Sequence, residues 1–392
     1  MRILFCNYEY PPLGGGGGVV MAAMARALAP RHEITVLTSL APGLARTQLD
    51  AGVRVVRVPV WFRKKLAVAN LPSMLAYLPA GLWRGWRLGR KGPFDVINTH
   101  FAVPTGPVGD WLSRLLDVPN VLSVHGGDLY DPSKRSSPHR HALLRLAVAR
   151  LLRRADVLVA QSQDTARNVA RIYKVDRPIE LVPLGIDRPN YHAVPERAAF
   201  QLPANAFVLV TAGRMVARKA NTQLIDTLAA IPEAVLLIVG DGPEAAVVRQ
   251  RAAERGVTGR LRMLGQVSDA VKFRALRAAD VFVSTSQHEG FGLVFLEAMA
   301  CGLPIVCYDR GGQTDFLTTP TTGNVVSLND LEAFNAAVRG LRDSPERRMR
   351  IGQYNLSKVE EFFIDRCAER YEQIFAAAVM RREHAPAHAE RH

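Results

Sequence analysis

The sequence predicts an α/β protein of two domains, each built on a doubly wound parallel sheet. Short apolar runs of strand length alternate with helix-like runs along both halves of the chain, as in β–α–β units. The 392 residues also exceed what one hydrophobic core usually holds. A Pro/Gly-rich exit at residues 179–191 separates the two alternating series. We therefore expect domains at residues 1–187 and 188–361, with a ligand cleft between them.

A glycine loop follows the first strand-like run, residues 2–8. Five glycines occupy residues 14–18 and precede a helix-like run. Because the loop lies at the carboxyl end of a parallel strand, where open α/β sheets bind ligands, we expect it to line a ligand. A flexible surface loop is the alternative, since five glycines in a row match many patterns and no Gly-Lys-[Ser/Thr] ending is present.

A basic, aromatic segment follows the strand-like run at residues 52–60. Residues 61–92 hold three of the four tryptophans and seven Arg and Lys residues. This composition suits an amphipathic helix lying in an anionic membrane interface. An ordinary helix that packs its Trp and Leu side chains inward explains it as well, and both interpretations stay open.

A histidine ends the strand-like run that begins at residue 120. His125 precedes Gly126-Gly127-Asp128. At a strand end it would be exposed to a cleft, where it could act on a substrate hydroxyl or a phosphate. The alternative is a turn histidine satisfied by the backbone.

Cations gather after the first strand-like run of the second half, residues 206–214. Arg214, Arg218 and Lys219 fall within six positions. Such a group just after a strand suits a pyrophosphate. A solvated helix start explains it less well, because a helix N-terminus disfavours cations.

The most informative stretch is residues 286–315, which read as the end of a strand, a Gly turn, a helix and another strand. Glu289 precedes the turn, and Glu297 lies about one turn inside the helix-like run at 293–300. The N–H groups of such a turn and helix start favour an anion, whereas the carboxylates accept hydrogen bonds from hydroxyls. The stretch suggests a ligand with phosphate and sugar hydroxyls; a helix start merely decorated with acids is the alternative.

The composition narrows the class of protein. The net charge of +14 calls for nucleic acid, an anionic membrane surface or a phosphorylated substrate, but no RNA-binding motif or zinc-finger spacing occurs, so nucleic acid is not expected. Four cysteines without metal-ligand spacing fit a cytoplasmic protein, with peripheral attachment to the inner face of the cell membrane as a further expectation. Polar residues 383–392 are expected to be a disordered tail.

Six motifs carry a resemblance to a known family. The chain resembles the retaining glycosyltransferases of family 4, which have the two-Rossmann-domain architecture called GT-B, over nearly its whole length. One such motif is weak evidence, whereas six in the correct order are specific. The matching segments are YPPLGGGGG (10–18), SVHGGD (123–128), VPLGID (182–187), TAGRMVARK (211–219), VGDGPE (239–244) and HEGFGLVFLEAMACGLPIV (288–306), the last with the family's Glu-x7-Glu motif.

The resemblance implies roles for individual residues. Arg214 and Lys219 would grip the donor pyrophosphate. Glu289 would bind the donor sugar's hydroxyls near the anomeric carbon, and Glu297 the ribose hydroxyls. His125 would touch the donor sugar or phosphate; with Glu289, Arg214 and Lys219 it is a catalytic candidate. A helix at about 362–380 would cross back to the first domain. The other implied donor contacts are Gly15, Gly16, Gly17, Gln266, Val267, Gly290, Phe291, Gly292 and Leu293.

The implied reaction is transfer of a hexosyl group, with retention, from a nucleotide diphosphate sugar to an acceptor hydroxyl. Glycolipid, lipopolysaccharide or other cell-surface polysaccharide synthesis is the expected setting. The leaving phosphate would help to remove the acceptor proton, so no residue is expected to be a nucleophile, and neither a metal nor a cofactor is expected. UDP- and GDP-linked donors both stay open, as does the oligomeric state.

Two departures from the family pattern blur the donor assignment. Ala220 stands where the family usually has Gly, and Asp315 stands where Glu is commoner. Two other functions stay open. One is a sugar-nucleotide epimerase of GT-B architecture, and the other is a basic membrane-binding module without catalysis.

Overall fold

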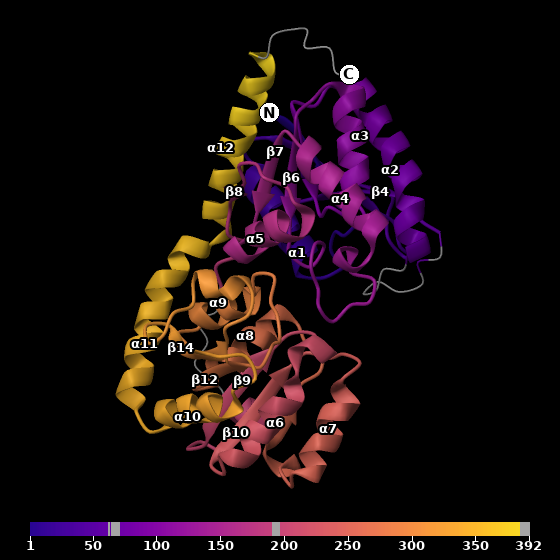
Figure 1. Cartoon of the computed structure of the whole chain (residues 1–392). Coiled ribbons are helices and arrows are strands. Elements are labelled where there is room, and N and C mark those ends of the chain that lie inside the picture. Colours follow the sequence, from indigo (N-terminus) through magenta and orange to yellow (C-terminus); the bar gives the residue numbers. More distant parts are fainter. Residues whose placement is uncertain (62, 64–70, 190–196, 385–392) are drawn as a thin grey trace. The chain divides into compact units, whose positions relative to one another are not determined.

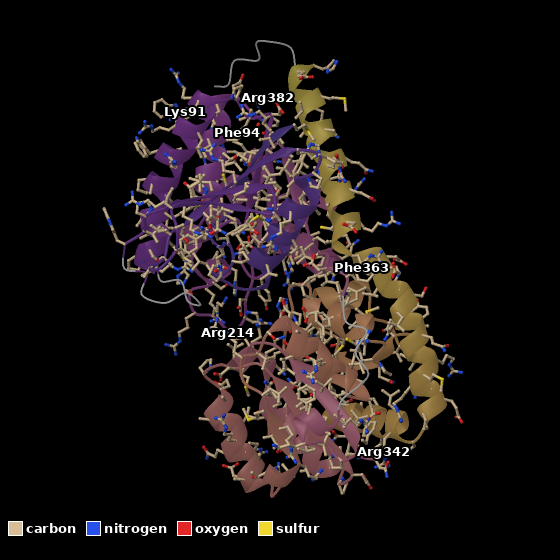
Figure 2. All side chains as sticks on the ribbon, turned by 180° about the vertical axis from the view of Figure 1, so that it is seen from behind. Lys91, Phe94, Arg214, Arg342, Phe363 and Arg382 are labelled. Carbon is tan, nitrogen blue, oxygen red and sulfur yellow. The ribbon has the colours of Figure 1, made fainter. Side chains whose placement is uncertain are left out.

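The computed structural model describes residues 1–61, 63, 71–189 and 197–384 (Figure 1). The chain divides into two compact units: unit 1 is Met1–Gly185 with Ile364–His392, and unit 2 is Ile186–Phe363. Each unit has its own sheet and its own buried apolar core (Figure 2). The expected fold class of two α/β units, each with an essentially parallel sheet, is confirmed.

The sheet of unit 1 has the strand order β3-β4-β2-β1-β5-β6-β7-β8. All its neighbouring pairs are parallel except β3–β4. Every residue of β5, β6 and β7 is buried, as expected where helices cover both faces of a parallel sheet. The strands are β1 (Arg2–Cys6), β2 (Glu33–Ser39), β3 (Thr47–Asp50), β4 (Val53–Val58), β5 (Val96–His100), β6 (Asn120–Val124), β7 (Val157–Ala160) and β8 (Glu180–Leu181).

The helices of unit 1 form two layers. Helices α1 and α12 pack on each other, and α12 also contacts β5 and β6. Helix α3 lies between α2 and α4 in the other layer (Figure 1). Among the described helices, none is both long enough and apolar enough to span a membrane. The bounds are α1 (Gly16–Leu28), α2 (Leu71–Lys91), α3 (Gly106–Leu116), η1 (Pro138–Arg140), α4 (Ala142–Arg154), α5 (Gln163–Tyr173) and α12 (Ile364–Glu383).

Unit 2 has a six-stranded sheet of order β11-β10-β9-β12-β13-β14, parallel throughout. Its strands are β9 (Phe207–Ala212), β10 (Ala234–Val239), β11 (Leu261–Met263), β12 (Val281–Ser284), β13 (Ile305–Tyr308) and β14 (Gly323–Val326). Its helices are η2 (Arg197–Phe200), η3 (Ala217–Lys219), α6 (Asn221–Ala230), α7 (Ala245–Glu254), η4 (Thr258–Arg260), α8 (Asp269–Arg277), α9 (Leu293–Ala300), η5 (Gly312–Asp315), α10 (Leu331–Arg342), α11 (Pro345–Lys358) and η6 (Val359–Phe362).

Two strand-level details differ from the sequence prediction. The run at 52–60 is only the second arm of a hairpin, because β3 pairs with β4 in antiparallel fashion. Ala51 and Gly52 turn the chain with φ of 46° and 85°, a pair of positive values that a tight hairpin turn requires. The sequence Thr-Gln-Leu-Asp of β3 is largely exposed and lacks the apolar alternation that marks a strand.

Candidate active site

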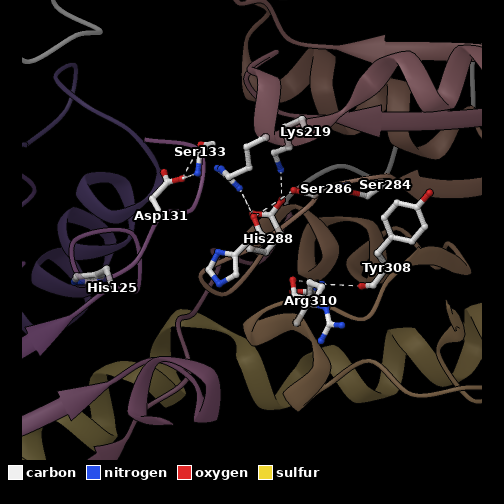
Figure 3. Close-up of polar contacts among 12 residues, drawn as sticks. His125, Asp131, Ser133, Lys219, Ser284, Ser286, His288, Tyr308 and Arg310 are labelled. Atoms are coloured by element: carbon white, nitrogen blue, oxygen red, sulfur yellow. Dashed lines mark hydrogen bonds and ion pairs between the residues drawn. The ribbon is translucent and has the colours of Figure 1, made fainter. Parts of the chain in front are cut away.

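Glu289 forms ion pairs with two cations of unit 2, Arg218 and Lys219, of which Lys219 is labelled in Figure 3. Its side chain is 8% exposed and follows β12. Arg218 Nη1 donates to Glu289 Oε2 at 3.0 Å and to the carbonyl of His288 at 2.6 Å. Lys219 Nζ donates to the other carboxylate oxygen, Oε1. Two cations and one carboxylate therefore meet at the carboxyl edge of the sheet.

The electrostatics of the cluster keep Glu289 ionised. Burial alone would raise the pKa of this carboxyl, but Lys219 and Arg218 outweigh the burial and lower the pKa to about 2. The cluster then carries one net positive charge at neutral pH. Such a group attracts an anion that is larger and more highly charged than a carboxylate.

The backbone holds the two cations against the exit of β12. The amide of Gln287 donates to the carbonyl of Arg218 at 2.8 Å. Thr285 Oγ1 donates to the carbonyls of Lys219 and Ala220 at 3.2 and 3.0 Å. Ala220 itself has φ of 45°, a left-handed conformation that costs an L-residue energy and that Gly adopts freely. The Gly that the family usually has at this position is therefore explained by the turn.

The second Gly pair fixes the backbone of Glu289. Gly311 has φ of 114°, and a Cβ added there would lie 2.0 Å from the carbonyl oxygen of Glu289. The amide of Glu289 donates to the carbonyl of Arg310 at 3.2 Å, and the amide of Gly312 donates to the carbonyl of Glu289 at 2.9 Å. Only a glycine permits this close approach.

Helix α9 begins directly after Glu289 and the Gly turn. Gly292 is its N-cap residue, with φ of 95°, and no side chain caps the helix there. The N–H of Phe295 donates to the carbonyl of Gly292 at 3.0 Å, whereas Leu293 and Val294 come before the first intrahelical bond, and N–H groups at such a helix start favour an anion. Phe291 packs inward against Phe316, with ring centroids 5.1 Å apart, so its amide and not its ring is left to face a ligand.

Glu297 is held by a residue that the sequence did not point to. Lys272 Nζ, on α8, donates to Glu297 Oε1 at 2.7 Å and lies 2.8 Å from Asp269 Oδ1. Burial raises the pKa of Glu297, and the attraction of Lys272 offsets only part of that effect. Gln266 and Val267 lie between β11 and α8, at the same edge of the sheet.

Not every expected cation joins the cluster. Among the described contacts of Glu289, the cations are Arg218 and Lys219, while Arg214 is exposed. The sequence predicts a pyrophosphate site from Arg214, Arg218 and Lys219 together, whereas the family resemblance implies roles only for Arg214 and Lys219. The donor-binding roles of Arg214, Lys219 and Glu297 stay predictions.

In unit 1, His125 is buried, which corrects the expectation that it is exposed. Its residue is 8% exposed, with Nε2 2.9 Å from His100 Nδ1 and Nδ1 3.1 Å from Gln161 Oε1. Burial lowers the pKa of His125 to about 4, so the ring is neutral at pH 7. The sequence missed this burial because His100 and Gln161 come from the neighbouring strands β5 and the end of β7.

The glycine loop of unit 1 reaches the same histidine through Phe101. A Cβ on Gly17 would lie 2.4 Å from the Phe101 ring, which is tilted against His125 with centroids 4.4 Å apart. Gly15 is the N-cap residue of α1, and its amide donates to Glu9 Oε2 at 3.1 Å. Gly16 is the first residue of α1. The loop and His125 thus form one continuous wall within unit 1.

Over the part of the chain that the structure describes, no three or more His, Cys, Asp or Glu side chains are grouped so as to hold a metal ion.

Comparison with known proteins gives two family models that match separate parts of the chain. Residues 14–188 match the model described as Glycosyltransferase Family 4, and residues 195–358 match the model described as Glycosyl transferases group 1. The chain is 28% identical to a D-inositol 3-phosphate glycosyltransferase of Xylanimonas cellulosilytica, over 95% of each chain. It is 29% identical to a 2-deoxystreptamine N-acetyl-D-glucosaminyltransferase of Streptomyces fradiae, over 88% of this chain and 89% of the relative.

Solved structures share the fold. The sucrose-phosphate synthase of Thermosynechococcus elongatus superposes with a TM-score of 0.82 at 24% identity, over 96% of this chain and 99% of that one. HepE of Anabaena, in complex with UDP and glucose, gives a TM-score of 0.78 at 20% identity, over 96% and 100%. These matches show the GT-B fold. Since the two family models together match most of the chain, the protein belongs to the GT-B glycosyltransferases of the family-4 type.

Proposed function

We propose that the protein is a retaining glycosyltransferase that moves a sugar from a nucleotide diphosphate donor to an acceptor hydroxyl. The observation that carries the proposal is the cluster of Arg218, Lys219 and Glu289 beside the uncapped start of α9. The two cations and the helix amides would take the diphosphate. Glu289 would then turn from its cations to the sugar hydroxyls.

The same groups supply the chemistry that the reaction needs. Cleavage of the bond between sugar and phosphate develops negative charge on the leaving diphosphate. Positioned cations and amides lower the barrier because they are directed at that charge before it forms. The Lys272–Glu297 pair would hold the ribose, so that α8 and α9 fix the nucleotide while the sugar reacts. No residue of the chain is proposed as a nucleophile.

Two classes of acceptor fit the proposal. The relatives are named for D-inositol 3-phosphate and 2-deoxystreptamine, which are polar cyclitols. A membrane glycolipid or a cell-surface polysaccharide precursor is the second class, and we favour it because of the surface of α2. The buried residues of α2 are Ser73, Tyr77, Gly81, Gly85 and Leu88.

We also propose an anionic membrane surface as a partner of residues 61–92, of which residues 62 and 64–70 lie outside the described structure. Trp83 and Trp86 are 55% and 40% exposed, so an inward-packed helix does not account for them. Arg87 and Arg90 lie over their rings, with guanidinium carbons 4.8 and 5.8 Å from the ring centroids. Aromatic rings interleaved with cations suit the headgroup region of an anionic bilayer.

The test of transfer begins with a thermal-shift screen of UDP- and GDP-linked sugars. A donor present at 100 times its Kd stabilises the folded state by about 2.7 kcal/mol. The stabilising donor is then incubated with cyclitol and glycolipid acceptors, and the anomeric configuration of the product is read by NMR. Glu289→Gln is expected to abolish transfer while the protein stays folded.

The rival functions give different results. An epimerised donor without any transfer product indicates the epimerase. The absence of stabilisation by any nucleotide sugar, together with membrane binding, indicates a module without catalysis. Wild-type turnover by Glu289→Gln contradicts the proposed site, and an inverted anomeric product contradicts retention.

A further inference from the structure

All four tryptophans of the chain lie on the surface of unit 1. Trp61, Trp83, Trp86 and Trp111 are 73%, 55%, 40% and 53% exposed. Tryptophan is highly buried on average, so four exposed copies in one unit need an explanation. Exposed Trp rings are typical of the interface between a membrane and water, where one end of the ring is apolar and the other is wet.

Helix α2 packs one apolar stripe on the core and exposes a second one, opposite the small residues that face α3. A Cβ added to Gly85 would lie 2.4 Å from Leu112, and one added to Gly89 would lie 2.5 Å from Leu116. The glycines therefore let α2 pack closely on α3. The opposite stripe of α2 is exposed and consists of Leu71, Leu75, Pro79, Trp83 and Trp86.

Helix α4 is exposed in an unusual way. Its first six residues, 142–147, are all exposed, although three of them are leucines. Leu143 and Leu146 are 83% and 65% exposed. On α3, which lies between α2 and α4, Trp111 and Leu115 are also exposed. The three helices lie side by side (Figure 1), and each exposes apolar side chains, which together form one outer face of unit 1.

The same face is strongly basic. Helices α2 and α4 each carry four Arg or Lys residues and no acid. They thus contribute more than half of the chain's net charge of +14. An aliphatic face with this charge favours a bilayer. Single-stranded nucleic acid is bound instead by a basic groove with aromatic side chains on which the bases stack.

A groove opens between α3 and α4 within this face. It measures about 1050 Å³, and Leu146 lies at its wall. Its charged and hydroxyl-bearing lining consists of Asp110, Ser113, Arg114, Arg150, Arg153, Arg154 and Asp156.

The groove is lined by more cations than carboxylates. Asp110 is paired with Arg114 and lies 3.7 Å from Arg154. Arg153 donates to the carbonyls of Tyr173 and Lys174, which are neutral acceptors. Within the described part of the chain, Arg150 forms no ion pair, although it is among the cations whose charge acts on Asp110. Four arginines and the two carboxylates of Asp110 and Asp156 line the groove, so the lining carries two net positive charges beside exposed leucines. This arrangement suits a phosphate attached to acyl chains.

We propose that the α3–α4 groove binds the phosphate of an anionic phospholipid while the face formed by α2, α3 and α4 lies on the bilayer. The inference rests on the membrane partner proposed above and extends it from residues 61–92 to α3 and α4. The leucines of α4 and the tryptophans of α2 and α3 enter the interface, and Arg150 contacts the headgroup.

The test uses the full-length protein and vesicles of phosphatidylglycerol mixed with phosphatidylcholine. Because all four tryptophans belong to unit 1, intrinsic fluorescence reports its contact with lipid directly. We expect a blue shift and co-sedimentation with these vesicles, and neither with pure phosphatidylcholine. Soluble glycerol phosphate at the same phosphate concentration is expected to give no blue shift.

The Arg150→Glu variant tests the contribution of the groove to vesicle binding. Because it reverses one charge, partitioning is expected to weaken roughly 10- to 30-fold. The matched control is Arg249→Glu, the same charge change on an exposed residue of α7 in unit 2, which is expected to bind like wild type. Leu143→Ser with Leu146→Ser tests the apolar part of α4. Each variant is checked for an unchanged melting temperature and unchanged stabilisation by the donor sugar.

The outcomes separate the two proposals. One outcome is that Trp83→Ser with Trp86→Ser loses vesicle binding, while Arg150→Glu and the Leu143/Leu146 variant bind like wild type. This outcome supports the membrane partner but contradicts phosphate binding in the groove. An Arg249→Glu effect equal to that of Arg150→Glu also overturns it, since binding then follows net charge. A blue shift with soluble glycerol phosphate alone indicates a site for free phosphate and contradicts the proposal that the ligand is a phospholipid. Self-association without lipid that shields the tryptophans overturns both.

Discussion

Removal of the Lys219 ammonium by Lys219→Met tests whether the charged cluster exists as described. The pKa of Glu289 is lowered from an ordinary 4.5 to about 2. At about 1.4 kcal/mol per tenfold change in acidity, the cluster contributes about 3 kcal/mol to stability at neutral pH. Since the folded pKa lies below the unfolded one, this stability is fully present above pH 4.5 and is lost as the pH falls toward 2. With only Arg218 left, Lys219→Met is expected to cost about 2–3 kcal/mol at pH 7.

The assay must report on unit 2, and tryptophan fluorescence does not, because every tryptophan belongs to unit 1. Hydrogen exchange of the β9 and β12 amides, read by mass spectrometry, gives the free energy of opening locally. Lys358→Met is the matched control, since Lys358 pairs with exposed Glu361 at 2.7 Å, and it is expected to cost less than about 1 kcal/mol.

A double variant sharpens the test. Lys219→Met with Glu289→Gln removes the charge that Lys219→Met leaves buried, so most of the lost stability is expected to return, while transfer stays absent. Two results would refute the reasoning. One is wild-type exchange in Lys219→Met at pH 7, and the other is the same loss of stability in the single and double variants.

Three further predictions follow from named contacts. Ala220→Gly is expected to stabilise unit 2 by about 1 kcal/mol, measured by hydrogen exchange of β9, because Ala220 has φ of 45°; a destabilised variant would contradict this. Lys272→Met is expected to raise KM for the donor with little change in kcat, because Glu297 loses the cation that holds it; an unchanged KM would contradict the ribose role. Gly85→Val is expected to destabilise unit 1 by about 1–3 kcal/mol in urea titrations followed by tryptophan fluorescence, because its Cβ would lie 2.4 Å from Leu112; wild-type stability would contradict the close packing of α2 on α3.

The elements that carry the charged cluster were predictable because their signals are local. A strand, a Gly turn and an eight-residue helix follow one another at 281–300, and Gly302, with φ of 72°, ends the helix as expected. The pairing of Glu289 with cations was predictable only in part. The sequence shows three cations after β9, namely Arg214, Arg218 and Lys219. Which of them reaches Glu289 depends on the conformation of the turn at Ala220, and the pattern of apolar residues does not predict that conformation.

Other features were not predictable because they depend on neighbours distant in sequence. His125 is buried by His100 and Gln161, which reach it only because β5, β6 and the end of β7 lie side by side. The outward direction of Trp83 and Trp86 depends on the glycines of α2 meeting Leu112 and Leu116 of α3. Helical periodicity in the sequence identifies an apolar stripe on a helix, but it does not show whether that stripe is buried or exposed.

The ion pairs of Glu289 also indicate how donor binding would proceed. Glu289 holds Arg218 and Lys219 in place before any donor arrives, so their rotamer entropy is already lost. A nucleotide diphosphate carries at least two negative charges and can displace a single carboxylate from both cations. The displaced carboxylate, buried and ionised, then needs hydrogen-bond donors, and sugar hydroxyls supply them.

A diphosphate without a sugar would leave that carboxylate without hydrogen-bond donors. We therefore expect the intact donor to bind more tightly than the nucleotide diphosphate alone, and this preference is expected to vanish in Glu289→Gln. Calorimetry of both ligands with both proteins decides it, and equal preference in the two proteins would contradict the displacement.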